Sequence, residues 1–251
     1  MLTDVLCPPW CRADGVVAGR VGAVSTTRSG GVSKPPFDSL NLGQHVGDAP
    51  TAVASNRARF SALLPVDMPL LWLDQVHGAR VAEADEWQPG IAADALLLRT
   101  PGKAAVVMTA DCLPILLTTL EGTVVAAVHA GWRGLAAGIV GATVARMGVA
   151  PGAVLAWIGP AISQAAFEVG DEVRAAFTDR HAGDAAHFAH NPRGRWQADL
   201  PGLALAALRR EGVHDVSVAG LCTAGAPARF FSHRRSAPTG RMATAIWLKA
   251  A

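Results

Sequence analysis

Three residues of the chain are donors that a zinc ion accepts: His77 in LDQVHG, Cys112 in TADCLPILL and His129 in VAAVHAGWRG. Two imidazoles and one thiolate form the ligand set of a catalytic zinc site, which keeps a fourth position open, whereas a structural site is closed by four ligands. Singly, each residue is more often part of a core, and no short zinc motif joins them. Cys112 and His129 both lie where an apolar run meets a turn, which favours a shared site.

Length and composition limit the class of protein. A chain of 251 residues with 51% hydrophobic content fits one α/β domain over residues 1–251, with residues 1–15 as an N-terminal extension. The net charge of +2 and the lack of a long basic run argue against nucleic acid as a partner. Without a signal-like N-terminus or an apolar stretch of about 18 residues, we expect a cytoplasmic monomer with no membrane segment. The four cysteines are then expected to stay reduced.

Strand-like and helix-like runs alternate at short intervals, which predicts an α/β fold. A Val- and Thr-rich segment over 15–27 leads into a long ordered loop rich in Gly, Pro and Asn. Residues 51–64 predict a helix with Thr51 as its N-cap, and the strand after it ends near His77.

The middle of the chain places two of the zinc donors at strand ends. Residues 104–119 predict a strand, a break before Cys112 and a second strand, because Pro114 cannot join a regular central ladder. A buried strand then closes at His129, and one helix is expected over 131–147.

The start of that helix favours an anion, with Arg133 at its entrance. The alternative is that Gly131 and Gly134 only permit a tight strand-to-helix crossing. Near the C-terminus, a helix and a strand precede a basic loop and a final strand. In that loop Arg234, Arg235 and Arg241 could bind phosphate or carboxylate oxygens, or form a solvated turn.

Many ordered motifs make the chain resemble a known family. They are STTRSGGVS, SLNLGQHVGD, LDQVHG, ADALLLRTPG, TADCLPILL, VHAGWRG, IGPAI, FEVG and FFSHRRSAPTGRMA, spread over roughly residues 20 to 248. Together they resemble the laccase-domain family of purine nucleoside phosphorylases, also called polyphenol oxidases and peptidoglycan editing factors. Members of the family often have Cys before FEVG and Tyr at two later positions, where this chain has Ala165-Ala166, Ala224 and His233. These departures bear on substrate preference and not on the metal.

The resemblance implies a single-domain, layered α/β/α sandwich like that of distant cysteine hydrolases. It implies a zinc site on His77, Cys112 and His129, with copper as the second candidate metal. The implied activity is phosphorolysis of adenosine, inosine, guanosine or methylthioadenosine to the free base and ribose 1-phosphate or its methylthio form, together with adenosine deamination.

Each reaction suggests roles for further residues. Deamination needs an activated water and a proton-transfer group, for which Asp111 is the candidate and Glu168 a weaker one. Phosphorolysis needs cations that hold phosphate and polar groups that hold base or sugar. The candidates for these contacts are Arg28, Asn41, His45, Arg133, Arg234, Arg235 and Arg241.

Three other functions compete with this interpretation. A multicopper oxidase needs many histidines with His-x-His pairs, and this chain has eight histidines and no such pair, which disfavours it. A cysteine hydrolase with a Cys112/His129 dyad, acting on peptidoglycan precursors, is the stronger alternative because a thiolate beside an imidazole is an activated nucleophile. A zinc-stabilised interaction module is weakest, since three ligands leave a structural site incomplete.

Overall fold

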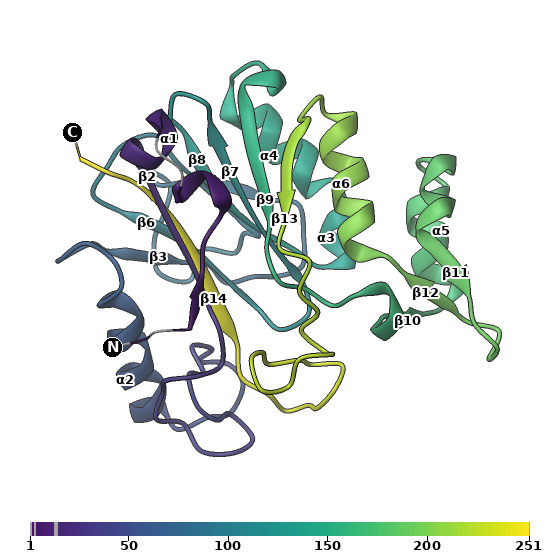
Figure 1. The fold of residues 1–251 in the computed structure, drawn as a ribbon, viewed down its shortest axis with the longest axis horizontal. Helices are drawn as coiled ribbons and strands as arrows, with labels where there is room; N and C mark the ends of the chain where they lie inside the picture. The colour runs from purple at the N-terminus through teal and green to yellow at the C-terminus, as the bar shows by residue number, and fades with distance from the viewer. Residues whose placement is uncertain (1, 3, 13–14, 251) are drawn as a thin grey trace.

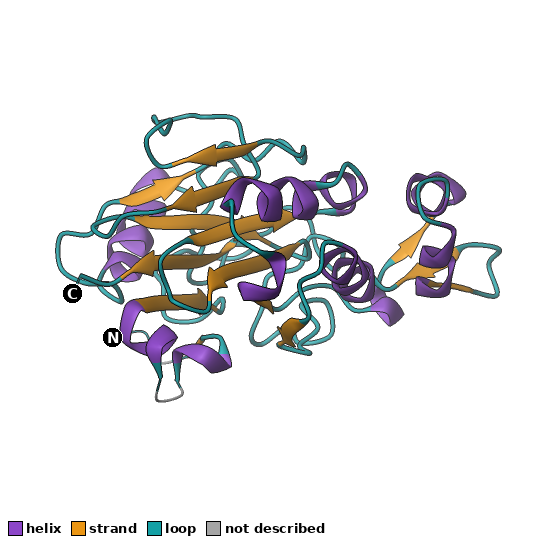
Figure 2. Cartoon of the chain, turned by 90° about the horizontal axis from the view of Figure 1, so that it is seen from above, coloured by secondary structure: helices purple, strands orange, loops and turns teal. Residues whose placement is uncertain are grey.

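The computed structural model describes residues 2, 4–12 and 15–250, so the expected N-terminal extension lies in part outside the described residues. Two β-sheets stack face to face, with helices on both outer faces (Figures 1 and 2). The first sheet has the order β1 (Val5–Leu6), β2 (Val21–Thr26), β14 (Met242–Leu248), β6 (Ala104–Thr109), β3 (Leu70–Trp72). The second has the order β13 (Asp215–Val218), β9 (Val154–Ile158), β7 (Leu113–Thr119), β8 (Val125–Ala130), β5 (Ala95–Leu98), β4 (Val81–Glu83).

The helices cover the two sheets unequally. Helix α2 (Pro50–Ser61) packs Phe60 against the first sheet. The second sheet is covered by α3 (Trp132–Ala136), α4 (Ile139–Met147) and α6 (Leu200–Arg210). Short helical segments complete the fold: α1 (Val16–Arg20), η1 (Pro9–Cys11), η2 (Pro151–Ala153), η3 (Gln164–Ala166) and η4 (Ala182–His187).

The inner strands of the second sheet are buried on both faces, because each face belongs to a different core. In β5, Ala95 and Leu97 join the core under the helices, whereas Leu96 and Leu98 join the core between the sheets. This period of two is what a strand buried on both sides requires. The predicted mixed α/β class is confirmed. A second sheet adds a layer to the expected α/β/α arrangement, because the first sheet buries one face on the second and the other on α2.

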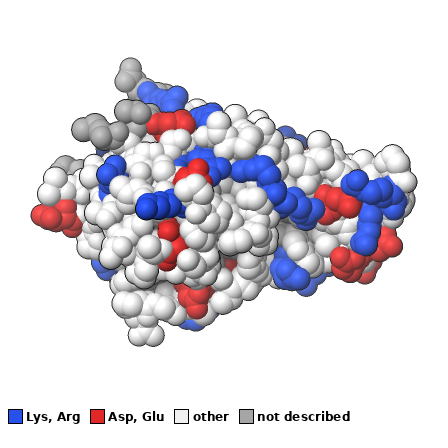
Figure 3. Space-filling view, turned by 90° about the horizontal axis from the view of Figure 1, so that it is seen from below, with Lys and Arg blue, Asp and Glu red and all other residues white. Residues whose placement is uncertain are grey.

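A small arm projects from the main body, at the right of Figures 1 and 2. It holds helix α5 (Asp171–Thr178) and a three-stranded sheet of β10 (Glu168–Val169), β12 (Trp196–Ala198) and β11 (Phe188–His190). Lys and Arg side chains lie interspersed with Asp and Glu on the face of the molecule seen in Figure 3. No helix in the described part of the chain is both long and apolar enough to cross a bilayer.

Most predicted elements are present, and the differences lie at their ends. The helix predicted over 51–64 is confirmed as α2, but Ala49 and not Thr51 is the N-cap, because Pro50 occupies the first helical turn. The single helix expected over 131–147 is wrong: Gly138, with φ 94°, separates α3 from α4. The left-handed backbone that glycine allows there ends one helix and starts the next.

Two further differences concern strands. The first part of segment 15–27 is the short helix α1, and the strand begins only at Val21. Pro114 lies inside the central strand β7, yet at its second residue, where the ladder to β9 has not begun. Its carbonyl still accepts a hydrogen bond from the Gly159 N–H at 2.9 Å, so the missing donor is harmless at this end of the strand.

Candidate active site

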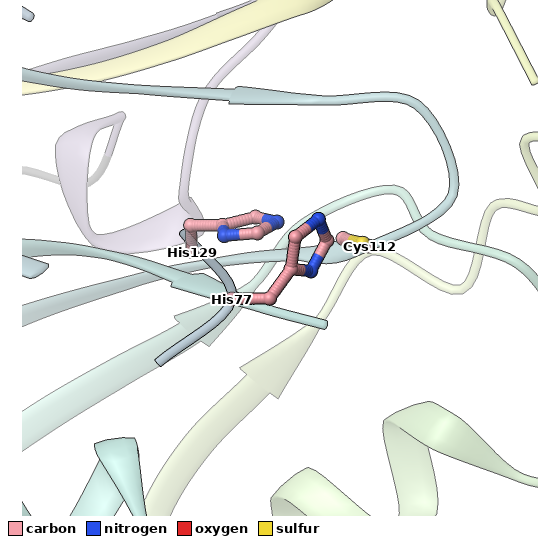
Figure 4. A group of neighbouring side chains, drawn as sticks. All are labelled: His77, Cys112 and His129. Carbon is pink, nitrogen blue, oxygen red and sulfur yellow. The ribbon is translucent and has the colours of Figure 1, made fainter. Parts of the chain in front are cut away.

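His77, Cys112 and His129 converge from three separate segments (Figure 4). Their nitrogen and sulfur donor atoms all lie within 4.8 Å of one another. His77 comes from the loop after β3, Cys112 from the break between β6 and β7, and His129 from the end of β8. The two imidazole centroids are 4.7 Å apart with their planes at 73°. The residues that the sequence singled out therefore form one cluster.

A fully buried carboxylate, Asp94, fixes two of these three donors. Its Oδ1 lies 2.8 Å from Nδ1 of His129. The backbone N–H groups of Val76, His77 and Gly78 also donate to it, at 3.3, 3.0 and 2.7 Å. Because a carboxylate only accepts, Nδ1 of His129 carries the proton and Nε2 is left for a metal. Sequence reasoning missed this residue, although Asp94 sits in the quoted motif ADALLL.

Two cavity residues have left-handed backbone that only glycine adopts freely. His77 has φ 58° and Asp111 has φ 94°. Such strain persists where neighbours over-determine the conformation, and it concentrates at functional sites. For His77 those neighbours are the hydrogen bonds to Asp94. For Asp111 they are three donors to its carboxylate: the Thr223 hydroxyl at 2.6 Å, the Ser232 hydroxyl at 3.0 Å and the Arg234 N–H at 2.7 Å.

Gly131 and Gly134 allow helix α3 to approach the cluster. A Cβ on Gly131 would lie 2.6 Å from Nδ1 of His77 and 3.1 Å from Sγ of Cys112. A Cβ on Gly134 would lie 2.7 Å from the carbonyl oxygen of Gly78. These glycines are therefore needed for space, which is the tight crossing that the sequence left open as an alternative to an anion site.

The electrostatics of the cluster favour a thiolate. Burial alone would raise the pKa of the Cys112 thiol, but the charge and hydrogen bonds of His129 and His77 outweigh it and lower the pKa to about 6. Burial opposes a charged His129, yet Cys112 and Asp94 raise its pKa to about 9. Without a metal, the pair is a thiolate beside an imidazolium.

The cluster opens into a cavity of about 570 Å³, within the range of small-molecule sites. Four of the lining residues belong to or pack against the core under the helices: Trp132, Ile162, Phe167 and Leu200. The polar lining includes His45, Asp74, Gln75, His233, Arg234 and Arg241. The Arg234 guanidinium lies over the Phe167 ring, 5.1 Å from its centroid. Met108 and Thr109 at the end of β6, with Asp111 and Cys112 just after it, also line the cavity. The cavity thus combines apolar, acidic and cationic groups.

Seven predicted site residues line this cavity: His45, His77, Asp111, Cys112, His129, Arg234 and Arg241. Arg241 donates to the carbonyls of Thr239 and Gly240 at 2.9 and 3.1 Å, and Arg234 donates to the carbonyl of Glu168 at 2.6 Å. Each guanidinium has five N–H donors, so both retain donors for a ligand.

Four predicted residues do not line it, and two of them, Arg28 and Arg235, hold loops. Arg28 pairs with Asp38 at 3.1 Å and donates to the carbonyl of Pro227 at 3.0 Å. Arg235 donates to the carbonyls of Thr223, Ala224 and Phe230, between 2.7 and 3.0 Å.

The other two are Asn41 and Arg133. Asn41 is fully buried and bonds to Gly43, Asp48 and the Arg241 N–H. Arg133 is exposed and stacks on Trp132 at 4.5 Å. The weaker candidate Glu168 also lies away from the cavity, where it binds Arg193 and Asn191.

The donor set fits a zinc ion. A thiolate and two imidazoles are ligands that zinc prefers, and three protein ligands leave the open position of a reactive site. His129 is oriented by a carboxylate behind it, which is the usual support for a metal-binding imidazole. Fold and site together define an α/β protein with a candidate metal centre at the floor of a small-molecule cavity.

Comparisons with known proteins identify the family. The family model described as multi-copper polyphenol oxidoreductase laccase matches residues 22–249. Purine nucleoside phosphorylase PA4543 of Pseudomonas aeruginosa is 51% identical over 242 residues, covering 96% of this chain and 98% of the relative. Purine nucleoside phosphorylase YfiH of Escherichia coli is 45% identical over 248 residues, covering 98% and 100%. The crystal structure of Neisseria meningitidis protein NMB0706 has a TM-score of 0.90 at 46% identity, covering 95% and 98%.

The chain therefore belongs to this laccase-like polyphenol oxidoreductase family, whose curated members include proteins named purine nucleoside phosphorylase. The resemblance predicted from the motifs is confirmed.

Proposed function

We propose that the protein is a zinc-dependent enzyme that cleaves purine nucleosides with phosphate, releasing the free base and ribose 1-phosphate. Adenosine, inosine, guanosine and methylthioadenosine are the proposed substrates. One observation carries the proposal: the His77, Cys112 and His129 donors lie within 4.8 Å of one another and line a cavity that also contains apolar side chains and two arginines. The names of the relatives support the same reaction.

The lining of the cavity suits the two parts of the reaction. A purine packs its flat faces on aromatic and aliphatic side chains, which Trp132, Ile162 and Leu200 offer. Phosphate needs fixed cations, which Arg241 and Arg234 provide, the latter with its guanidinium over the Phe167 ring. Phosphorolysis is then a matter of holding phosphate against C1′ of the ribose while charge develops on the leaving base.

Zinc would be held by Nε2 of His129, by His77 and by the Cys112 thiolate, and it would supply a Lewis acid with an open position. Adenosine deamination at the same centre is the proposed second activity, since the same Lewis acid can serve attack by water at C6 of the purine.

The experiment is to incubate the purified protein with adenosine or inosine, with and without phosphate, and to separate the products by chromatography. Ribose 1-phosphate that forms only with phosphate supports phosphorolysis. Inosine that forms from adenosine regardless of phosphate supports deamination. Elemental analysis of the same sample distinguishes zinc from copper. Absence of both products in metal-loaded protein would refute the proposal.

The thiolate favours a second candidate, a cysteine hydrolase that attacks an amide, for example in a peptidoglycan precursor. Its basis is the lowered pKa of Cys112 beside an imidazolium. Zinc binding and nucleophilic attack both require the sulfur atom of Cys112, so one excludes the other. A chelator therefore separates the two functions: it abolishes purine chemistry, whereas it leaves or increases amide hydrolysis.

A further inference from the structure

One carboxylate of the cavity, Asp74, is free to bind a ligand. The cavity is lined by two carboxylates, and the other, Asp111, already accepts three hydrogen bonds. The Asp74 carboxylate makes no hydrogen bond or ion pair with the residues that the structure describes. Its main chain is held firmly, because its N–H donates to Ile91 at 2.9 Å and its carbonyl accepts from Ala93 at 3.1 Å. The result is a fixed backbone that presents an unpaired carboxylate.

The neighbours of Asp74 narrow the chemistry of that ligand. Gln75 is unavailable, because its amide donates to the Met108 carbonyl at 2.8 Å and accepts from the Met108 N–H at 2.7 Å. His45 lies within reach of the Asp74 charge, yet burial and the nearby Arg241 lower its pKa, so it stays a neutral imidazole. A carboxylate beside a neutral imidazole repels phosphate and accepts hydrogen bonds from hydroxyl groups.

A nucleoside brings two kinds of surface to the cavity, a flat base and a sugar that carries hydroxyl groups. Apolar lining residues such as Trp132, Ile162 and Leu200 suit the base, whereas His45 and Asp74 suit the sugar. The 2′- and 3′-hydroxyls of the sugar are adjacent and can share the two oxygens of one carboxylate.

We propose that Asp74 binds the vicinal diol of the ribose and makes the site selective for ribonucleosides over 2′-deoxyribonucleosides. The inference rests on the proposed function for its substrate. It assigns a specificity-determining role to a residue three positions before the candidate ligand His77.

The test compares kcat/KM for inosine and for 2′-deoxyinosine in the wild type, Asp74→Ala and Asp74→Asn. The two glycosidic bonds differ in intrinsic lability, but this difference cancels when the substrate ratio is compared between variants. We expect the inosine to deoxyinosine ratio to fall about tenfold or more in Asp74→Ala, because the charged acceptor of the two hydroxyl groups is lost. Asp74→Asn, which keeps one acceptor oxygen, should fall between that variant and the wild type.

Asp85→Asn is the matched control, since Asp85 is an exposed aspartate outside the cavity and should leave the ratio unchanged. Thermal melting checks that all variants fold. An unchanged ratio in Asp74→Ala, or equal losses on both substrates, overturns the inference.

Binding measurements separate this inference from the proposed function. Calorimetric titration of the same variants with inosine and 2′-deoxyinosine, without phosphate, needs no turnover. If the wild type binds inosine more tightly and Asp74→Ala removes the preference, the inference holds even where phosphorolysis is absent. If turnover occurs with no Asp74-dependent preference, the proposed function holds and the inference fails. If neither nucleoside binds, both fail.

Discussion

The floor and the rim of the cavity are built in different ways. The floor holds Cys112 and His129 beside strand ends and His77 on the loop after β3, and one buried carboxylate, Asp94, connects the segments of His77 and His129. The rim consists of irregular loops, and Arg241 reaches the cavity from one of them. In the floor, each side chain chosen for its metal-binding chemistry belongs to the site. In the rim, a side chain chosen for its phosphate-binding chemistry supports a loop as often as it lines the cavity.

The arginines show why the rim behaves so. All four arginines named here donate to backbone carbonyls, but Arg241 and Arg234 also line the cavity, whereas Arg28 and Arg235 lie outside its lining. Loops lack a ladder of their own, so their carbonyls need side-chain donors, and guanidinium groups supply several at once. Residue type alone therefore does not separate a ligand contact from a loop support.

The largest expected effect is at the floor. Cys112→Ala removes one of three ligands, so we expect the metal to be lost and both purine activities to fall together by about a thousandfold or more. Metal content by elemental analysis and product formation by chromatography measure this. Cys7→Ala is the control, since Cys7 is a cysteine outside the cavity. Retained turnover in Cys112→Ala would separate the activity from the cluster.

The support behind the floor should matter nearly as much. Asp94→Asn is expected to weaken metal affinity about tenfold to a hundredfold, because an amide cannot accept both the His129 N–H and the loop N–H groups in the same way. Competition with a chromophoric chelator measures the affinity, and the absorption spectrum of the cobalt-substituted protein reports the ligand geometry. An unchanged affinity and spectrum would show that the cluster positions itself.

The rim prediction contrasts two arginines. Arg241→Met should raise the KM for phosphate about tenfold with a smaller change in kcat, because a cation that faces the cavity is lost. Arg28→Met should leave that KM unchanged and lower thermal stability, by about 1–3 kcal/mol, because the carbonyls of Asp38 and Pro227 lose their donor. The same KM change in both variants would remove the distinction drawn between the two residues.

The smallest effect is a shift on the pH axis. In metal-free protein, alkylation of Cys112 by iodoacetamide should be half-maximal near pH 6, since its pKa is lowered to about 6 and only the thiolate reacts. The rate rises as pH increases through that value and is lost below it. Cys11, whose pKa burial raises to about 12, should stay unreactive at pH 9. Peptide mapping by mass spectrometry follows each cysteine. A midpoint near the ordinary thiol value of about 8.5 would show that His129 does not stabilise the thiolate.

The fold could be predicted from the sequence where the spacing of apolar residues is regular. It was harder to predict where backbone geometry determines the end of an element. Apolar runs located β6, β7 and β8, and the break before Cys112 was expected from Pro114. The division of α3 from α4 at Gly138 was not foreseen, because helical spacing continues through a glycine that has left-handed backbone. The second sheet was also missed, since a strand buried on both faces has the same composition whatever covers it.

The site residues also fall into those that the sequence could identify and those that it could not. The three donors could be chosen by chemistry, but Asp94 could not, because its role depends on N–H groups of a loop that is 16 to 18 residues away in the chain. Arg28, Asn41, Arg133 and Arg235 matched the chemistry of phosphate or sugar contacts and lie outside the cavity lining. Distinguishing them required the hydrogen-bond partners of the loops, which no sequence pattern states.

The double burial of β8 constrains how this site can evolve. Val125 and Ala127 face the core between the sheets, Ala126 and Val128 face the helices, and His129 continues the first series. Inserting or deleting one residue within the strand would exchange the two faces and turn the imidazole away from its partners. Descendants of this chain can thus vary freely in rim length, while the strand that carries His129 must keep its residue count.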